Sequence, residues 1–378
     1  MKVALIHDYL NEFGGAERVL LALSEIYPKA PIYTAFYKKK SEAYERFKGK
    51  DIRTSWVHKI PFFAGKLHSP LRFLAPWIWG SFSAKGGWEG LLDYDVVISS
   101  SSWYVTKGFG VGVEFCYCHT PPRWLYGYKT SVEWRKFWLV RIYGQIVGHF
   151  MRQYDYKQAQ KVNYFIANSK EVQKRIKKFY RRESKVIYPP ARLLLVKRSG
   201  LSVKRKDYYL VVSRLVGGKG LRMAIKAINK LGKKLKIVGE APKSFTAGLK
   251  KDLVKLAGNN IEFLGQVSDE KLVELYSKAK GFLALAENED FGITPVEAMS
   301  CGTPVIAFRG GGYMESVVEN KTGVFFDEYG VNSLIKAIKK FEKMKFKSQD
   351  CVKRAEKFSK ERFKKKIREF VEENFSLE

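Results

Sequence analysis

The sequence of 378 residues has little cysteine, and its four cysteines follow no recognisable spacing. No CxxC pair and no spacing typical of a zinc site occurs among Cys116, Cys118, Cys301 and Cys351. A disulfide-stabilised domain or a structural zinc site depends on such a pattern. The sequence therefore favours a reducing compartment over a disulfide framework.

Long apolar runs are missing as well. No run reaches about 18 apolar residues, which is the length that a membrane-spanning helix needs. The first ten residues, MKVALIHDYL, carry one lysine and then four apolar residues before His7 and Asp8. This pattern is typical of a buried strand and not of a secretory signal. We therefore expect a soluble or peripheral protein located in the cytoplasm.

Acidic residues are scarce, because 38 Asp and Glu stand against 69 Lys and Arg, for a net charge of +31. Such an excess implies attraction to nucleic acid, to an anionic bilayer or to phosphorylated substrates. A lysine-rich composition with solvated helix faces is the alternative explanation for part of it. A basic nucleic-acid-binding protein stays open as a second hypothesis, although the sequence lacks zinc spacing, an RNP-like strand and a concentrated recognition helix.

What the sequence does contain is a regular alternation of short apolar runs with helical patterns. This alternation predicts an α/β fold of two doubly wound domains, each with a parallel sheet. The length and a hydrophobic content of 46% suit two separate cores. We expect a first domain over residues 1–189, a basic linker over 190–206 and a second domain over 207–355. Residues 356–378 predict an amphipathic helix that packs back on the first domain.

The first domain offers two candidate ligand sites. A strand over residues 3–7 leads into Gly14-Gly15 and then a helix, and phosphates often bind at such a helix N-terminus. The loop has no complete GxGxxG motif, so a plain tight turn is the alternative. Further on, a strand over residues 114–119 ends in His119 before two prolines. Ligands of open α/β sheets lie beyond the carboxyl ends of strands, so His119 is a candidate site residue or else a structural histidine.

The second domain has its own glycine loop, VGGKG, between a predicted strand and a predicted helix. Arg214 stands at the end of the strand, and Lys219 stands at the start of the helix. Two cations beside a helix N-terminus form a suitable cradle for a diphosphate. The loop is not a Walker motif, and solvated loop charge is the alternative.

The stretch over residues 286–304 organises this second domain. We expect a capping box in which Thr294 is the N-cap, Pro295 the first helical residue and Glu297 the third. Gly292 would let the backbone approach a ligand closely, and the helix N-terminus would attract an anion. Two carboxylates, Glu289 and Glu297, flank this point, so a ligand with both phosphate and hydroxyl groups fits, such as a nucleotide sugar. A purely structural cap is the alternative.

Residues 56–90 and 134–141 mix aromatic residues with lysine and arginine. Trp and Tyr beside basic residues suit a bilayer interface, and an aromatic core segment under a long loop is the alternative. Asp93-Tyr-Asp95 superficially resembles a metal-binding DxD motif. It heads a buried strand, so we interpret it as structural.

With these motifs in view, the whole chain resembles the retaining glycosyltransferases of family four, which have the GT-B fold of two facing Rossmann-like domains. The second half carries the resemblance in VVSRLVGGKG, IVGE, FLGQVSDEKLVELY and ENEDFGITPVEAMSCGTPVIA. The first half is similar to the mannosyltransferase branch of polysaccharide and lipid-linked glycan assembly, through HDYLNEFGGAERV, YCHTPPRWLY and VIYPPAR. Asp290 stands where glycine is commoner, and Gly217-Gly218 where an acidic residue often stands.

The resemblance implies an acceptor-binding first domain, a nucleotide-sugar-binding second domain and a role for each candidate residue. Arg214 and Lys219 would neutralise the donor diphosphate as charge grows on the leaving group. Glu289 would bind the hydroxyls of the donor sugar, and Glu297 those of the ribose. The other implied contacts are His119 to the transferred sugar, the N–H groups of Phe291, Gly292, Ile293 and Thr294 to sugar and phosphate, Gly14 and Gly15 over the diphosphate, and Gly239, Glu240 and Val267 near the base.

The resemblance also implies the reaction. We expect retaining, metal-independent transfer of a hexose from GDP-mannose, or from a UDP-sugar as second choice, to a lipid-linked or polysaccharide hydroxyl. The nucleotide sugar is a substrate, so no cofactor is expected. The expected partners are this donor, the glycan or lipid-linked acceptor and an anionic membrane surface, without nucleic acid, at the cytoplasmic face of the membrane. A catalytically silent membrane-surface protein that keeps the fold is a third hypothesis.

Overall fold

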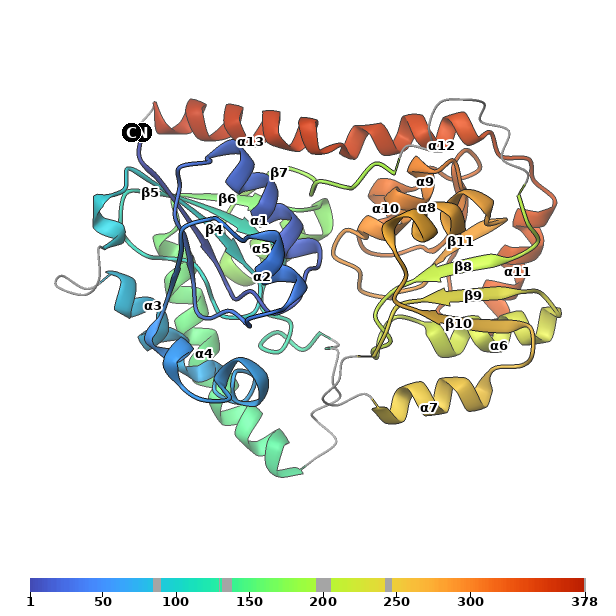
Figure 1. The fold of residues 1–378 in the computed structure, drawn as a ribbon, viewed down its shortest axis with the longest axis horizontal. Helices are drawn as coiled ribbons and strands as arrows, with labels where there is room; N and C mark the ends of the chain where they lie inside the picture. Colours follow the sequence, from blue (N-terminus) through green and yellow to red (C-terminus); the bar gives the residue numbers. More distant parts are fainter. Residues whose placement is uncertain (84–89, 129, 131–137, 195–204, 242–246, 377–378) are drawn as a thin grey trace. The chain divides into compact units, whose positions relative to one another are not determined.

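The computed structural model describes residues 1–378 except 84–89, 129, 131–137, 195–204, 242–246 and 377–378. The chain divides into two compact units. Unit 1 comprises residues 1–128, 134–190 and 360–378, and unit 2 comprises residues 129–133 and 191–359. Figure 1 shows the elements of each unit. No helix in the described part of the chain is both long enough and apolar enough to cross a bilayer.

Unit 1 is built on a parallel sheet of seven strands in the order β3-β2-β1-β4-β5-β6-β7. Short apolar runs such as VALIH form these strands because both faces of the sheet are covered. The order reverses between β1 and β4, which is the switch point where open α/β sheets bind ligands. The strands are β1 (Val3–His7), β2 (Ile32–Thr34), β3 (Ile52–Thr54), β4 (Val96–Ser101), β5 (Val113–Cys118), β6 (Tyr164–Ala167) and β7 (Lys185–Val186).

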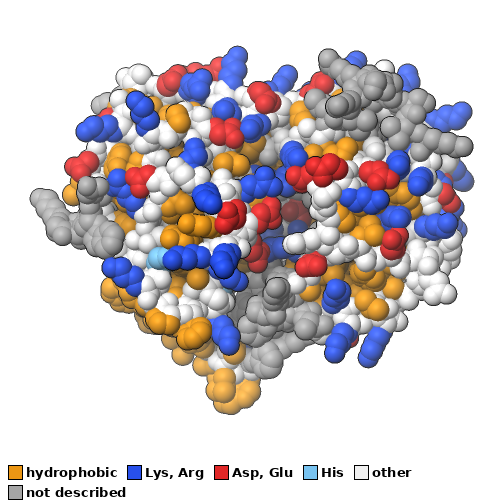
Figure 2. Space-filling model, viewed as in Figure 1, with side chains coloured by type: hydrophobic (Ala, Val, Ile, Leu, Met, Phe, Trp, Pro, Cys, Tyr) orange, Lys and Arg blue, Asp and Glu red, His pale blue; other side chains and the backbone are white. Residues whose placement is uncertain are grey.

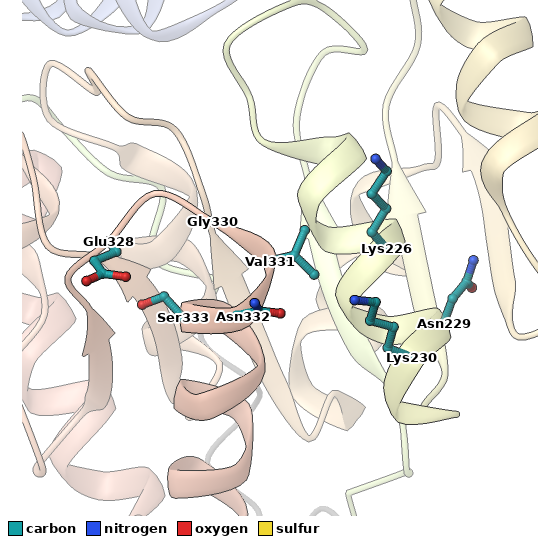
Figure 3. A pocket seen from close by; sticks show the side chains of 8 residues that line it. All are labelled: Lys226, Asn229, Lys230, Glu328, Gly330, Val331, Asn332 and Ser333. Atoms are coloured by element: carbon teal, nitrogen blue, oxygen red, sulfur yellow. The ribbon is translucent and has the colours of Figure 1, made fainter.

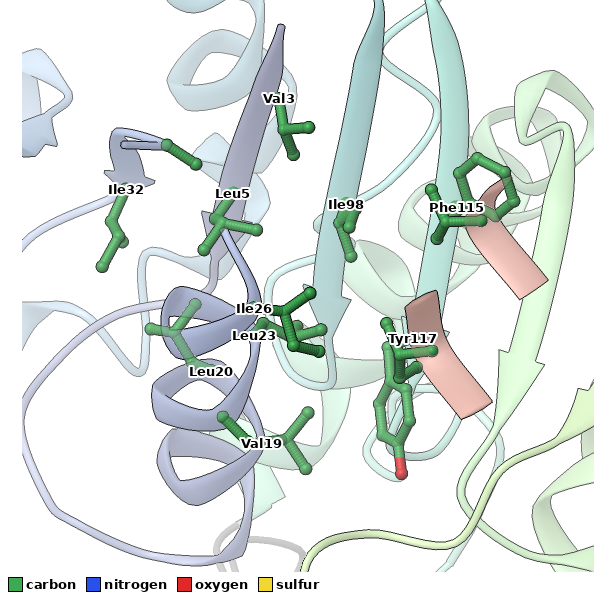
Figure 4. Close-up of a cluster of buried hydrophobic side chains, with 14 of the residues drawn as sticks. Val3, Leu5, Val19, Leu20, Leu23, Ile26, Ile32, Ile98, Phe115 and Tyr117 are labelled. Carbon is green, nitrogen blue, oxygen red and sulfur yellow. The ribbon is translucent and has the colours of Figure 1, made fainter. Parts of the chain in front are cut away.

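One face of this sheet is covered by helices from both ends of the chain. Figure 4 shows Val19, Leu20 and Leu23 of the first helix pointing into the core beside the sheet. The last helix adds Phe363 and Ile367 to the same cluster of buried side chains. The helices of unit 1 are α1 (Gly15–Ile26), α2 (Glu42–Arg46), α3 (Ala75–Ser83), α4 (Trp138–Lys161), α5 (Lys170–Tyr180) and α13 (Lys360–Phe375), with short turns η1 (Trp56–Lys59), η2 (Phe63–Leu67), η3 (Arg72–Leu74) and η4 (Leu91–Asp93).

The aromatic segment after β3 contributes to the core on the other face of the sheet. Phe63, Trp79 and Phe82 are buried there, together with Met151 of α4. The nearby Trp77 is exposed. The interpretation as an aromatic core segment is therefore confirmed for part of this segment, whereas the bilayer interface stays a prediction. The nine-residue helix α3 was not expected, because its apolar residues show no clean period.

Unit 2 repeats the design with six parallel strands in the order β10-β9-β8-β11-β12-β13, and here the order reverses between β8 and β11. The strands are β8 (Tyr209–Val212), β9 (Leu235–Val238), β10 (Ile261–Gly265), β11 (Gly281–Ala284), β12 (Val305–Phe308) and β13 (Gly323–Phe326). The helices are α6 (Leu221–Leu231), α7 (Ala247–Leu256), α8 (Asp269–Lys278), α9 (Ile293–Ser300), α10 (Tyr313–Ser316), α11 (Val331–Glu342) and α12 (Ser348–Ala355), followed by the turn η6 (Glu356–Phe358).

Two parallel-sheet domains with a C-terminal helix on the first are thus confirmed, with one correction at the last helix. The sequence predicts a helix from residue 356, but Ser359 is extended and α13 begins at Lys360. Phe358 therefore does not share the inward face of α13. It packs in unit 2, where its ring centroid lies 5.3 Å from that of Phe291. Of the expected linker over 190–206, residues 195–204 lie outside the described residues.

Candidate active site

In unit 2 the loop after β8 meets the loop after β11. The ammonium group of Lys219 lies 2.8 Å from a carboxylate oxygen of Glu289, and both side chains keep some exposure, 31% and 19%. Gly220 makes this approach possible, because its φ of +70° is open to glycine and a Cβ there would lie 2.6 Å from Leu285 Cβ. The structure thus brings together two of the predicted residues, 70 positions apart in the chain.

The backbone of Glu289 is in contact with the glycine run that follows β12. The amide of Gly312 donates to the Glu289 carbonyl at 3.0 Å, and a Cβ on Gly311 would lie 2.2 Å from that oxygen. The Tyr313 hydroxyl lies 3.4 Å from a Glu289 carboxylate oxygen. Burial and the neighbouring Glu289 carboxylate raise the pKa of Tyr313 well above its usual value, so the phenol stays neutral and can donate to that carboxylate.

The expected capping box at Thr294 is wrong. Helix α9 begins at Ile293 with Gly292 as its N-cap, so Pro295 is the third helical residue. Gly292 adopts a φ of +83°, a conformation that glycine takes without strain, so the turn into the helix lies before Thr294. The first N–H groups of a helix have no carbonyl partner within it. The N-terminus of α9 therefore follows directly after Phe291 and Gly292, beside Glu289.

Glu297 lies in the middle of α9 and is buried. Its side chain is 3% exposed, and the Tyr276 hydroxyl of α8 donates to one of its oxygens at 3.2 Å. Glu289 stands in the loop before α9, whereas Glu297 lies within the buried body of that helix. The two glutamates therefore stand in different environments.

The residues expected near the base lie at neighbouring strand ends. The amide of Gly239 donates to Gly265 O at 2.8 Å, which joins the ends of β9 and β10. A Cβ on Gly239 would lie 2.1 Å from Ser213 O, so β8 also approaches closely. Beside this junction, Glu240 is exposed and Val267 is half-buried. Arg214 is exposed at the end of β8, on the same edge of the sheet.

In unit 1 the predicted glycine loop is connected to His119 by a chain of polar side chains. The amide of Gly14 donates to one oxygen of Glu17 at 2.8 Å, and Gly15 begins α1. The other Glu17 oxygen lies 3.6 Å from Nε2 of His7. Burial opposes ionisation of Glu17, but the hydrogen bond and charge of His7 outweigh it and lower the pKa of this carboxyl.

Ser100 completes this connection. Its Oγ lies 3.0 Å from Nδ1 of His7 and 2.8 Å from Nε2 of His119. A hydroxyl carries one proton, so Ser100 can donate to one imidazole only while it accepts an N–H from the other. The proton positions on the two histidines are therefore linked. Burial and the neighbouring His7 lower the pKa of His119 to about 3, so this imidazole is neutral near pH 7.

Sequence reasoning missed Glu17, Ser100 and Tyr313 as parts of the site. Ser100 lies in a run of four serines at the end of a strand, which is a usable signal. Tyr313 follows directly on a triple glycine, which marks a close approach of the backbone. Neither pattern indicates the partner residue, because each partner comes from a distant part of the chain.

The described residues include no group of three or more His, Cys, Asp or Glu side chains arranged to hold a metal ion. Asp95 of the DxD-like stretch accepts a hydrogen bond from the backbone amide of Lys2 at 2.7 Å. It therefore anchors the first strand, as a structural reading of this stretch requires.

Figure 3 shows a surface pocket of unit 2, lined from α6 by Lys226, Asn229 and Lys230 and from the start of α11 by residues 330–333, with Glu328 before it. None of these residues is among the predicted donor contacts. The pocket is therefore separate in composition from the loops around Lys219 and Glu289.

The match to a known protein family falls in unit 2. Residues 196–358 match the family described as "Glycosyl transferases group 1". This range covers almost all of the larger segment of unit 2. Unit 2 therefore resembles the glycosyltransferase group 1 family. The loops that carry Arg214, Lys219 and Glu289 lie within the matched residues.

Two curated relatives are similar over shorter ranges. A GDP-mannose-dependent alpha-(1-6)-phosphatidylinositol monomannoside mannosyltransferase of Mycolicibacterium smegmatis is 31% identical over 162 residues, 40% of this chain and 42% of that protein. The lipopolysaccharide core biosynthesis mannosyltransferase LpcC of Rhizobium leguminosarum bv. viciae is 40% identical over 81 residues, 21% of this chain and 22% of that protein. The chain thus spans less than half the length of these relatives.

Solved structures are similar over the whole chain. Anabaena HepE, in complex with UDP and glucose, matches with a TM-score of 0.71 and 20% identity over 98% of this chain and 99% of that one. Sucrose-phosphate synthase of Thermosynechococcus elongatus matches with a TM-score of 0.74 and 16% identity over the full length of both. At these identities the matches establish the fold, which is the GT-B fold of glycosyltransferases.

Proposed function

We propose that the protein is a retaining glycosyltransferase that moves a hexose from a nucleoside diphosphate sugar to an acceptor hydroxyl. The observation that carries this proposal is the Lys219–Glu289 pair, 2.8 Å apart in the loops before α6 and α9, within residues that match the glycosyltransferase group 1 family. A cation and a carboxylate beside helix N-termini can bind the two halves of such a donor, the diphosphate and the sugar hydroxyls.

In the reaction, Lys219 and Arg214 neutralise the diphosphate as the anomeric carbon becomes oxocarbenium-like. This electrostatic stabilisation of the leaving group is the main catalytic contribution of the chain. The acceptor hydroxyl attacks from the face that the diphosphate leaves, and the departing phosphate takes its proton. Glu289 accepts hydrogen bonds from the sugar hydroxyls, and neutral His119 contacts the transferred sugar.

The remaining donor contacts complete the proposal. The N–H groups of residues 291–294 reach sugar and phosphate at the mouth of α9, and Gly14-Gly15 covers the diphosphate. Glu297 binds the ribose while Tyr276 holds its second oxygen, and the base lies against residues 239–240 and Val267. Since the two cations take the charge of the leaving group, we propose activity without a metal or another cofactor.

We propose GDP-mannose as the donor and a lipid-linked or polysaccharide hydroxyl as the acceptor. The two mannosyltransferase relatives support this choice, because one is named as GDP-mannose-dependent and the other as a lipopolysaccharide core enzyme. A UDP-sugar is the alternative donor, which the UDP-bound structural neighbour suggests. We further propose that the protein acts at the cytoplasmic face of a membrane, peripherally bound to its anionic surface, where a lipid-linked acceptor would be found.

The test is donor binding and transfer by the wild type and two lysine variants. Thermal-shift screening against a nucleotide-sugar panel should single out GDP-mannose, because a bound donor stabilises the folded state. Lys219→Met should lower kcat by about 10²–10³-fold, the usual cost of one transition-state electrostatic contact. Lys226→Met, on the exposed face of α6, is the matched control and should retain activity, as should the wild type in EDTA.

Equal turnover by both variants would refute the site. Stabilisation by no nucleotide sugar, together with salt-sensitive binding of duplex DNA, would favour a nucleic-acid-binding protein. Membrane binding without transfer to any glycan acceptor would favour a catalytically silent surface protein.

A further inference from the structure

Helix α4 in unit 1 presents an apolar face to solvent. Trp138, Ile142, Ile146 and Phe150 follow one another at intervals of four residues, so they lie along one side of the helix. Their exposed fractions are 64%, 45%, 57% and 64%. Large apolar patches of this kind are uncommon on monomeric proteins and mark surfaces that contact another phase or partner.

The aromatic segment before α4 extends this surface. Phe62 and Trp77 are 79% and 61% exposed. The hydroxyl of Tyr143 donates to the carbonyl of Pro70, which ties α4 to this segment. We call the exposed side chains of Phe62, Trp77, Trp138, Ile142, Ile146 and Phe150 the apolar face of unit 1. Figure 2 shows hydrophobic side chains gathered at the lower end of unit 1, where α4 runs in Figure 1.

Helix α4, which carries most of the apolar face, is anchored in the core of unit 1. Met151 of α4 is buried in the aromatic core with Phe63 and Trp79, and Val147 packs against the same cluster. One side of α4 therefore fits the core while the other carries the apolar residues. Because the helix is fixed in its rotation, the exposure of these side chains is a property of the packed unit.

The charge of the residues around the apolar face favours an anionic partner. Residues 56–83 and 138–154 together contain five Lys or Arg and no Asp or Glu. The next acidic residue, Asp155, is buried and paired with Lys107. Lys66 and Arg141 are exposed beside the apolar residues. Two copies joined through this face would bring like charges together, whereas anionic headgroups would neutralise them.

We propose that the apolar face of unit 1 docks the protein on an anionic bilayer, with its aromatic and aliphatic side chains at the boundary of headgroups and acyl chains. Helices with an apolar face and a basic rim bind lipid in this orientation, and Trp favours that depth. This deepens the membrane association in the proposed function by naming its surface. It does not require transferase activity.

The experiment measures co-sedimentation with vesicles of phosphatidylcholine alone or mixed with phosphatidylglycerol. Wild type should bind the mixed vesicles at low salt and lose binding as salt rises. Ile146→Glu/Phe150→Glu should lower the partition coefficient at least about tenfold, because two carboxylates would enter the interface. Val254→Glu is the matched control, since Val254 is 50% exposed on α7 of unit 2, and it should bind as wild type does.

Three outcomes would overturn the proposal. Wild type does not bind the mixed vesicles at low salt, the double variant binds as well as Val254→Glu, or light scattering shows a dimer that the double variant dissociates. The thermal shift with nucleotide sugar, measured on the same variants, should be unchanged. A variant that loses vesicle binding but keeps this shift is folded, so failure of docking and failure of the donor site are separate results.

Discussion

Ser100→Ala is the sharpest probe of the polar chain in unit 1, because it removes one oxygen atom and almost no volume. That oxygen lies 3.0 Å from Nδ1 of His7 and 2.8 Å from Nε2 of His119. Ser100 itself is fully buried, and the two histidines are 2% and 9% exposed. Water therefore has little access to replace the lost hydroxyl.

The loss of stability depends on Nδ1 of His7 and Nε2 of His119, which both lose the hydroxyl as a hydrogen-bond partner. A buried polar group that loses its partner costs roughly 1–3 kcal/mol. Both imidazoles are affected, and the small exposure of His119 relieves part of the cost, so we expect unit 1 to lose about 2–4 kcal/mol. In a His119→Gln background the same change should cost less, because one of the two contacts has already been altered.

Urea unfolding followed by tryptophan fluorescence isolates this effect. All eight tryptophans lie between Trp56 and Trp138, within unit 1, so the signal does not report on unit 2. Ser24→Ala is the control, because Ser24 is 1% exposed and donates only to Leu21 O of its own helix, at 2.9 Å. It should change stability by less than about 0.5 kcal/mol. If Ser100→Ala costs no more than this control, the polar chain contributes nothing.

Two further predictions concern pH and a glycine. The pKa of buried His119 is lowered to about 3 from 6.5, so between these pH values the unfolded state binds a proton that the folded state does not. The free energy of unfolding of unit 1 should therefore fall by up to about 1.4 kcal/mol per pH unit as pH falls from 6.5 to 5. His119→Gln should flatten this slope. Gly292→Ala should destabilise unit 2 by more than ~2 kcal/mol in calorimetry, because φ is +83° and the new Cβ would lie 2.5 Å from the Tyr313 ring. Gly248→Ala, in an open helical position, should be neutral or stabilising, and equal effects of the two glycine changes would contradict this reasoning.

Elements with a complete local signal could be predicted to the residue. The start of α8 has such a signal, because Ser268 caps the helix by accepting from the Lys271 amide at 3.2 Å. Strand β1 agrees with the expected strand over residues 3–7, since an apolar run defines it. In such segments the residues that set the boundary lie within a few positions of it.

The start of α9 shows where local signals fail. Thr294, Pro295 and Glu297 have the spacing of a capping box, yet the helix starts at Ile293. Gly292 is the N-cap instead, with a φ of +83°, and a Cβ there would lie 2.5 Å from the ring of Tyr313, some twenty residues further on. Glu297 is buried and accepts a hydrogen bond from Tyr276 of another helix.

By itself the sequence determined two doubly wound units, the positions of the glycine loops and a basic, aromatic first half, because apolar period, glycine placement and charge are local properties. Only the tertiary structure decided which side chains meet. The register of β1 on β4 sets His7 opposite Ser100, 93 residues away, and the rotation of α4 in its core decides that Ile146 and Phe150 face solvent. Strand register and helix rotation depend on the whole core, so no single stretch of the chain contains them.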